Sequence, residues 1–387
     1  MRICFIGHNI HFLSSASGSA VLPRETIKCV YKNTEISLIT TEDYDTLNRR
    51  LYEEPLKEFQ PILRRFNSVH RVIRKSSLPL YSITSYSELS KFVKSLHVDI
   101  LHLFELYPLS LPLIYKLAHR IGAKVIYHAY MPVNNIIGKV RTFFLKRFTD
   151  GIIVSSPHVL RSFVDLKRVK LMRIIPPPID TNVYRPTGHV ASNEHVMLYI
   201  GPLDTRRFPI NLMIKLVKHL QHNIPELKLT VVVAPRFRDD LLKLNLLLRM
   251  AFREGIERNL QIIYTRLSTE EKVSLYSNAD IILFPFSKSY KGAVDPPLTL
   301  LEAMACGGLI VATNVLSIPW IIRNRYNGFI CPDHAQMFST IKEVLMLTDM
   351  RKSLIRNRAV ETIQKRFSSA VIRNQILSFY NKVITAR

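Results

Sequence analysis

The first half of the chain alternates short apolar runs with stretches in which apolar residues recur every three or four positions. The apolar runs predict strands, and the helical spacing between them, as in Leu111 to Arg120, predicts helices. The predicted strands are Ile3 to Gly7, Glu35 to Thr40, Ile100 to Phe104, Lys124 to His128, Gly151 to Ser155 and Arg173 to Ile175. Strands that alternate with helices are typical of a parallel α/β sheet.

The alternation resumes in the second half. Its predicted strands are Val196 to Ile200, Lys228 to Val233, Leu260 to Tyr264, Ile281 to Phe284 and Leu309 to Ala312, with helices at Leu212 to His222, Asp239 to Arg253 and Thr269 to Ser277. The prolines 176–178 and the polar residues after Thr187 read as a linker. We therefore predict two doubly wound domains, residues 1–187 and 188–367, that face a central cleft, with a last helix within 368–387.

Residues 295–332 carry the strongest chemical signal. A Pro-rich loop leads into a short helix that contains Glu302, and Gly307-Gly308 end that helix before the next strand. The unpaired N–H groups at a helix start, here those of Leu298 and Thr299 directly after Pro297, suit a phosphate. Glu302, two turns into the helix, is then placed to accept hydrogen bonds from hydroxyls of the same ligand. Phosphate and vicinal hydroxyls together describe a nucleotide; the alternative is an ordinary loop–helix–strand unit.

This segment resembles the signature of glycosyltransferase family 4, whose members are retaining enzymes of the GT-B fold. The similarity extends through the turn at Asn327-Gly328 and through most of the chain, including Leu198 to Gly201 and Ala279 to Pro285. The resemblance implies two Rossmann-like domains, with the last helix crossing back to the first domain. It also implies transfer of a hexose from a UDP- or GDP-linked sugar, without a further cofactor, to a lipid-linked or polymeric glycan acceptor.

The resemblance assigns roles to the donor side, with two departures. Glu302 matches the family glutamate that holds the ribose, whereas Val294 occupies the place of the glutamate that contacts the transferred sugar. The neighbouring Asp295 is expected either to take over that contact or to cap the following helix. Where the family has a diphosphate-binding arginine and lysine, this chain has Pro202 and Arg207, and Arg207 is a reasonable replacement for the lysine.

Three further assignments stay open at this point. Arg206 or Arg266 would have to supply the missing arginine, unless residues 206 and 207 form a solvated loop. In the first domain, Gly18 ends a Ser/Gly-rich loop, at the place where the family loop meets donor phosphate. His128 matches a histidine that contacts the donor sugar. His102 and Glu105 are weaker candidates, and since no carboxylate pair is spaced to hold a metal, we expect metal independence.

The net charge of +24 calls for an anionic partner. Residues 61–75 read as a basic amphipathic helix that would contact an anionic membrane through Arg64, Arg65, Arg71, Arg74 and Lys75. Residues 139–147 repeat the pattern. The alternative is that both helices pack their apolar stripes inward and that the charges are solvated.

The remaining composition narrows the class of protein. No apolar run is long enough to span a bilayer, no signal peptide begins the chain, and the four cysteines lack metal-binding spacing. We therefore expect a cytoplasmic protein, on the inner face of the membrane if it contacts lipid. Two rival functions are a nucleic-acid binder, against which the lack of any DNA-binding motif argues, and a catalytically silent relative that binds sugar nucleotides.

Overall fold

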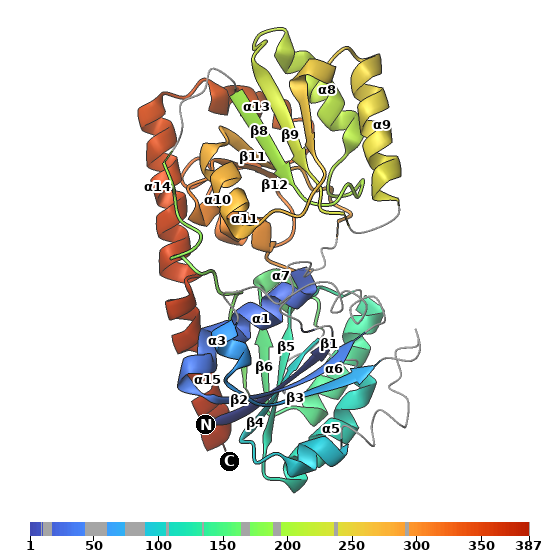
Figure 1. The fold of residues 1–387 in the computed structure, drawn as a ribbon, viewed down its shortest axis with the longest axis vertical. Coiled ribbons are helices and arrows are strands. Elements are labelled where there is room, and N and C mark those ends of the chain that lie inside the picture. The colour runs from blue at the N-terminus through green and yellow to red at the C-terminus, as the bar shows by residue number, and fades with distance from the viewer. Residues whose placement is uncertain are drawn as a thin grey trace. The chain divides into compact units, whose positions relative to one another are not determined.

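The computed structural model describes residues 1–8, 10, 18–42, 60–73, 90–105, 108–133, 135–163, 171–188, 195–235, 239–290 and 294–386. These residues form two compact units (Figure 1). Unit 1 comprises Met1–Pro178, Gly292–Leu298 and Ser369–Arg387, and unit 2 comprises Ile179–Lys291 and Thr299–Ser368.

Unit 1 is built on a seven-stranded sheet with the order β3-β2-β1-β4-β5-β6-β7, and all its neighbouring strands are parallel. The strands are β1 (Arg2–His8), β2 (Glu35–Glu42), β3 (Phe66–Ile73), β4 (Ile100–Phe104), β5 (Lys124–Ala129), β6 (Gly151–Val154) and β7 (Met172–Ile174). The strand order reverses between β1 and β4, and the carboxyl ends of strands at such a switch point are where ligands of open sheets bind.

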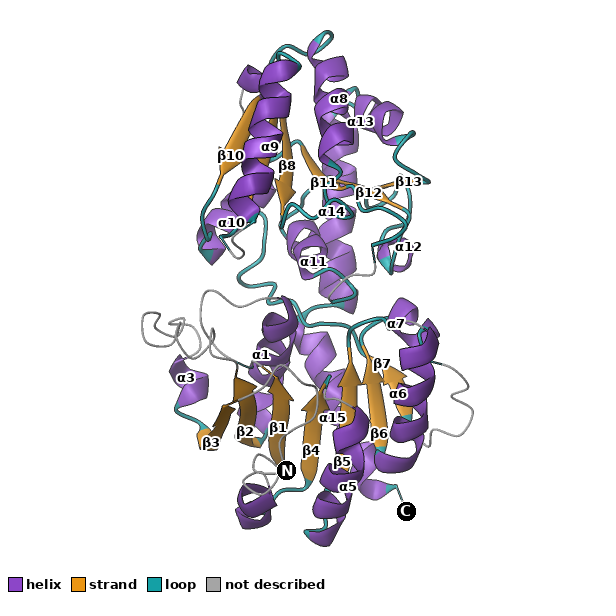
Figure 2. Ribbon diagram, turned by 90° about the vertical axis from the view of Figure 1, so that its right-hand side faces the viewer, coloured by secondary structure: helices purple, strands orange, loops and turns teal. Residues whose placement is uncertain are grey.

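Helices cover both faces of this sheet (Figure 2). They are α1 (Gly18–Val30), α3 (Gln60–Leu63), α5 (Leu111–Arg120), α6 (Asn135–Phe148), α7 (Pro157–Arg161) and α15 (Ser369–Thr385). One face is buried by α1 and α15, whose Ile372, Ile376 and Phe379 join the core beneath β1 and β4. The opposite face is buried by α5 and α6 through residues such as Leu117 and Leu145.

Unit 2 repeats the plan with a six-stranded parallel sheet of order β10-β9-β8-β11-β12-β13. Its strands are β8 (His195–Ile200), β9 (Leu227–Val232), β10 (Leu260–Ile263), β11 (Ile281–Phe284), β12 (Ile310–Thr313) and β13 (Phe329–Cys331). Its helices are α8 (Ile210–Gln221), α9 (Asp240–Arg253), α10 (Thr269–Asn278), α11 (Leu298–Ala305), α12 (Ile318–Ile321), α13 (Met337–Leu345) and α14 (Asp349–Arg366). The predicted parallel α/β architecture is confirmed in both units.

The ends of α11 follow from local sequence. Gly307 has φ +75° and ends the helix, and the Gly308 and Gly307 N–H groups donate to the carbonyls of Ala303 (2.8 Å) and Met304 (3.1 Å). This pair of bonds is a Schellman motif, for which glycine is favoured because its left-handed conformation has no side-chain clash. A Cβ at Gly308 would lie 2.3 Å from Ile282 Cδ1, so β11 and α11 approach closely at this glycine.

The boundaries of the units differ from the predicted domains of residues 1–187 and 188–367. The chain passes from unit 1 to unit 2 after Pro178. The Ile179 N–H donates to the Phe367 carbonyl (2.8 Å) and Ile179 pairs with Ser368, so Ile179 already belongs to unit 2. The structure also groups Gly292–Leu298 with unit 1, where Val294 and Leu298 join the core that contains α1 and α15. The last helix, α15, belongs to unit 1 as well.

The basic amphipathic helix predicted over residues 61–75 is wrong. The chain forms the short α3, a turn at Arg64 and Arg65, and then β3, which pairs in parallel with β2 at the edge of the sheet. The apolar residues of this segment match a helical period by coincidence, whereas its β-branched residues favour a strand, and pairing with β2 decides between them. Arg64 and Arg65 are exposed; Arg74, Lys75 and the Arg71 side chain lie outside the described residues.

Residues 139–147, by contrast, do form a helix, within α6. Within the part of the chain that the structure describes, no helix combines the length and the hydropathy that crossing a membrane requires.

Candidate functional site

Glu302 lies in the second turn of α11 and is almost fully buried, at 6% exposure. Its Oε2 lies 3.5 Å from the Lys272 ammonium and accepts a hydrogen bond from the Tyr276 hydroxyl (3.4 Å), and both partners come from α10. Burial and the Glu302 charge raise the pKa of Tyr276 well above its usual value, so the phenol stays a donor. Both contacts fall on Oε2, and Oε1 accepts from no described side chain. The carboxylate is thus held in place with one oxygen available for a hydroxyl.

The start of α11 presents unpaired polar groups. Thr299 Oγ1 is buried and has no hydrogen-bond partner among the described residues. Pro297 precedes the helix and Leu298 begins it, and these two residues are buried in unit 1, whereas Thr299 belongs to unit 2. A buried hydroxyl without a partner at a helix start is a site where an oxyanion would supply the missing acceptor.

Arg207 follows the first strand of unit 2 and sits among aromatic rings. Its guanidinium lies 5.4 Å from the ring centroids of both Phe286 and Tyr290, which is a cation–π arrangement. Its Nε is buried and has no described partner. Gly201 lies against the same group, because a Cβ there would come within 3.4 Å of Arg207 Nη2 and 2.8 Å of the Tyr199 hydroxyl oxygen. The structure therefore packs Arg207 among aromatic rings and leaves its Nε without a described partner.

Arg206, the residue before Arg207, already has a hydrogen-bond partner for its guanidinium. Its guanidinium donates to both carboxylate oxygens of Asp204 at 3.3 and 3.2 Å, and its backbone N–H donates to the same side chain at 2.8 Å. The side chain is 57% exposed. Of the two neighbouring arginines, Arg207 is the one placed to bind a ligand. Arg266, the other candidate, donates to the Pro235 carbonyl at 3.4 Å.

In unit 1, His128 is the penultimate residue of β5 and the last member of a buried polar chain. The Tyr380 hydroxyl lies 2.5 Å from His102 Nδ1, and His102 Nε2 lies 3.2 Å from His128 Nδ1. His128 Nε2 is buried with no hydrogen-bond partner among the described residues. Burial lowers the pKa of His128 to about 3 and that of His102 well below its usual value, so both rings are neutral near pH 7.

The donors and acceptors within this chain favour one pair of tautomers. His102 is the one hydrogen-bond partner that the Tyr380 hydroxyl has among the described residues, so donation to His102 Nδ1 satisfies the buried phenol proton. His102 then carries its proton on Nε2 and donates it to His128 Nδ1. His128 is left with its proton on Nε2, the atom without a partner. The chain therefore presents one N–H donor at the carboxyl end of the sheet.

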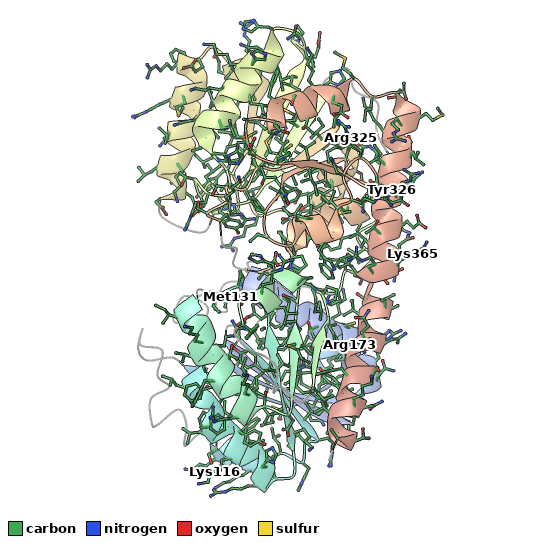
Figure 3. The ribbon with its side chains drawn as sticks, turned by 180° about the vertical axis from the view of Figure 1, so that it is seen from behind. Lys116, Met131, Arg173, Arg325, Tyr326 and Lys365 are labelled. Atoms are coloured by element: carbon green, nitrogen blue, oxygen red, sulfur yellow. The ribbon has the colours of Figure 1, made fainter. Side chains whose placement is uncertain are left out.

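Glu105 follows β4 and holds the turn after β5. Its Oε1 accepts from the N–H groups of Tyr130 (2.6 Å) and Met131 (2.7 Å) and from the Arg141 guanidinium (2.9 Å). The carbonyl of Met131, a residue labelled in Figure 3, accepts a hydrogen bond from the Arg141 guanidinium (3.1 Å). Glu105 has φ 43°, a conformation that this dense set of bonds maintains. Its role is to position the turn after His128.

Asp295 is fully buried and its bonds go to unit 1. Its N–H donates to the Tyr130 carbonyl (3.0 Å), the Ser155 hydroxyl donates to its carbonyl, and the Ser156 hydroxyl donates to its Oδ2. Ser156 also caps α7 by accepting from the Val159 N–H at 3.0 Å. In this structure Asp295 anchors its loop; contact with a transferred sugar stays a prediction. Val294, beside it, is a core residue at 8% exposure.

Gly18 begins α1, as a loop-to-helix start would require, while residues 14–17 lie outside the described part of the chain. Within the described residues, no group of three His, Cys, Asp or Glu side chains is arranged to hold a metal ion. Sequence reasoning missed several partners that the fold supplies from distant segments: Lys272, Tyr276, Ser156 and Tyr380. None of them lies in a recognisable motif, and each is brought in by packing.

Comparison with known proteins fits this geometry. The profile described as Glycosyl transferases group 1 matches residues 181–360, and that described as Glycosyltransferase Family 4 matches residues 30–183. D-inositol 3-phosphate glycosyltransferase of Mycobacterium tuberculosis is 23% identical over 248 residues, which is 61% of this chain and 49% of the relative. The chain thus spans about half the length of the curated relatives that it matches.

Solved structures share the fold over the whole chain. Anabaena HepE in complex with UDP superposes with a TM-score of 0.76 at 15% identity, covering 99% of this chain and 100% of that one. A glycosyltransferase from Rickettsia africae gives a TM-score of 0.75 at 15% identity, covering 100% and 99%. The two parallel sheets are therefore those of the GT-B architecture, and the two matched profiles, which together span residues 30–360, make the chain a glycosyltransferase family 4-like protein.

Proposed function

We propose that the protein transfers a hexose from a nucleoside diphosphate sugar to a lipid-linked or polymeric glycan acceptor, with retention of the anomeric configuration. Within this proposal Glu302 accepts the ribose hydroxyls, and Arg207, Gly18 and the start of α11 meet the diphosphate. His128 donates to the transferred sugar.

The observation that carries the proposal is the buried Glu302 carboxylate, which has partners on one oxygen and no described side-chain donor on the other. A buried carboxylate is costly unless it is paired and hydrogen-bonded, and Lys272 and Tyr276 supply both on a single oxygen. The other oxygen suits vicinal hydroxyls, which need an acceptor. The partnerless Thr299 hydroxyl, three residues earlier on the same helix, suits an adjacent phosphate. UDP is supported as the nucleotide because the similarly folded Anabaena protein binds it.

The protein's part in the reaction is charge stabilisation and placement. When the sugar–phosphate bond breaks, negative charge develops on the diphosphate, and a fixed guanidinium such as that of Arg207 lowers the barrier. The acceptor hydroxyl oxygen bonds to the anomeric carbon on the face that the diphosphate leaves, and the leaving diphosphate takes the hydroxyl proton, so no protein nucleophile is required. Because Arg207 supplies a positive charge, we expect activity without added divalent metal; turnover that disappears with a chelator and returns with Mg²⁺ would contradict this.

The acceptor is proposed to be reached at an anionic membrane. On α6, Ile136, Val140 and Phe143 recur at helical spacing and are 76%, 46% and 50% exposed. The Arg147 guanidinium lies 3.9 Å from the Phe143 ring centroid, beside the same stripe. Exposed apolar side chains framed by cations are typical of a helix that lies in the headgroup region. This helix replaces residues 61–75 as the surface that supports membrane contact in unit 1.

Substitution of Glu302 tests the donor site. Glu302→Gln removes a charged acceptor and leaves Lys272 unpaired, so we expect UDP to bind about 10- to 100-fold more weakly by calorimetry. The matched control is Glu361→Gln, which removes the same charge from an exposed ion pair with Lys365. Unchanged UDP affinity in Glu302→Gln would contradict the assignment.

A silent sugar-nucleotide binder is the second candidate, because the position of the family glutamate that contacts the transferred sugar is the core residue Val294. Measuring UDP-sugar turnover together with UDP affinity separates the two. Binding with neither transfer nor donor hydrolysis would favour the silent form.

A further inference from the structure

The outer side of α9 in unit 2 exposes large apolar side chains together with arginines. Five large apolar residues on this 14-residue helix are exposed: Leu241 54%, Leu242 70%, Leu246 50%, Leu248 49% and Phe252 75%. The helix lies on the outside of the unit with no other helix of that unit in front of it (Figures 1 and 2). A monomeric protein seldom exposes a contiguous apolar patch of this kind unless the patch binds something.

Three of these apolar residues lie on the outer half of the helix, and the other two lie on its flank. At 100° per residue, Leu242, Leu246 and Phe252 fall on the half opposite Leu244, Leu247 and Ala251, which are buried in the core of unit 2, whereas Leu241 and Leu248 lie on one side between the two halves. Asn245, Arg249 and Arg253 share the outer half, and no acidic residue does. With a rise of about 1.5 Å per residue the face is roughly 20 Å long.

The charge around this face is positive. Acidic side chains occur only near its ends, where Asp239 pairs with Lys243 and Glu254 pairs with Lys218, each at 2.7 Å. Arg249 and Arg253 are exposed and form no ion pair with a described residue. A long arginine side chain beside leucines can lay its stem on apolar surface while its guanidinium reaches a headgroup phosphate.

We infer that this face of α9 docks on an anionic lipid bilayer. A second copy of the chain would bring the same unpaired arginines, and a net charge of +24, against themselves. An anionic bilayer offers apolar depth for the leucines and opposite charge for the arginines. The surface is separate from α6 and lies in the other unit. Its binding to lipid requires neither the sugar donor nor the glycan acceptor, so it can be tested independently of the proposed function.

The test is co-sedimentation of the full chain with vesicles, without nucleotide. Vesicles of phosphatidylcholine alone are compared with vesicles of equal parts phosphatidylcholine and phosphatidylglycerol. We expect binding to the anionic vesicles, about tenfold weaker for Leu242→Asp and for Phe252→Asp. Met350→Asp in α14, at a residue 83% exposed, is the matched control, because it makes the same charge change elsewhere on unit 2 and should bind like the wild type.

Each other outcome overturns the inference. Equal binding by all variants shows that α9 is not the contact. Loss only in Ile136→Asp assigns the contact to α6. A wild-type dimer that Leu242→Asp separates, with no vesicle binding, assigns the face to a second copy. Circular dichroism checks that the exposed substitutions leave the fold intact.

Discussion

The hydroxyl of Tyr380, seven residues from the end of the chain, lies 2.5 Å from Nδ1 of His102, which in turn contacts His128. The C-terminal helix α15 therefore does more than cover the sheet of unit 1. Its Tyr380 hydroxyl is a donor that favours the tautomer pair in which His128 Nε2 carries a proton.

Tyr380→Phe should free these tautomers. With the hydroxyl gone, His102 Nδ1 is a buried acceptor without a donor, and we expect the protein to lose about 1–2 kcal/mol of unfolding free energy. Because His128 would then spend part of its time with Nε2 unprotonated, kcat should fall several-fold while UDP affinity stays constant. Tyr326→Phe in unit 2 is the control. Equal stability loss without any change in kcat would make Tyr380 purely structural.

The histidine pair also predicts acid sensitivity. Both pKa values are lowered by burial, to about 3 for His128, whereas an unfolded histidine titrates near 6.5. Between these values the unfolded state binds more protons than the folded state, so stability rises with pH. It should be complete above about pH 6.5 and fall below it, by at most about 1.4 kcal/mol per pH unit for each histidine. Urea titrations of the wild type and of His128→Asn measure the slope, which the variant should reduce.

Arg207 and Arg206 make a matched pair for the diphosphate. Arg207→Gln removes a guanidinium with a partnerless buried Nε, and we expect UDP affinity to drop about 10- to 100-fold through loss of charge-assisted bonds. Arg206→Gln makes the same charge change in an exposed pair with Asp204, and should change affinity less than about threefold. Calorimetry with UDP measures both. A larger effect from Arg206 would mean that the loop rearranges on binding.

The fold was largely predictable because its signals are local. Buried parallel strands are continuous apolar runs, so β4, β5 and β11 were found within a residue or two, and Gly307 marked the end of α11. The helix predicted over residues 61–75 was wrong for a physical reason. The apolar positions fit both a helical and a strand period, and only pairing with β2 made the segment a strand. Local sequence does not contain that information.

The site was predictable in part. Glu302, Thr299 and Arg207 sit in a motif or at a fixed distance from one. In the structure Glu302 is buried, and Thr299 Oγ1 and Arg207 Nε are buried atoms with no partner among the described residues. Ser156 and Lys272 come from distant elements and carry no signal of their own. Asp295 shows what the sequence leaves open: its position suggests a ligand contact, which stays a prediction, while Ser155 and Ser156, which carry no signal in the sequence, bind it in the structure.

A double-mutant cycle separates those two roles of Asp295. If the carboxylate serves to hold its loop to Ser156, Ser156→Ala and Asp295→Ala should each cost about 1–3 kcal/mol of stability, and together hardly more than either alone. Both should lower the transfer rate in parallel, since they release the same loop at the start of α11. Asp295→Asn keeps an acceptor for the Ser156 hydroxyl and should retain most stability and rate. If Asp295→Asn instead abolishes transfer while Ser156→Ala leaves it unchanged, the carboxylate acts on the sugar and the anchoring role is secondary. Urea denaturation and initial-rate measurements on the three variants give the answer.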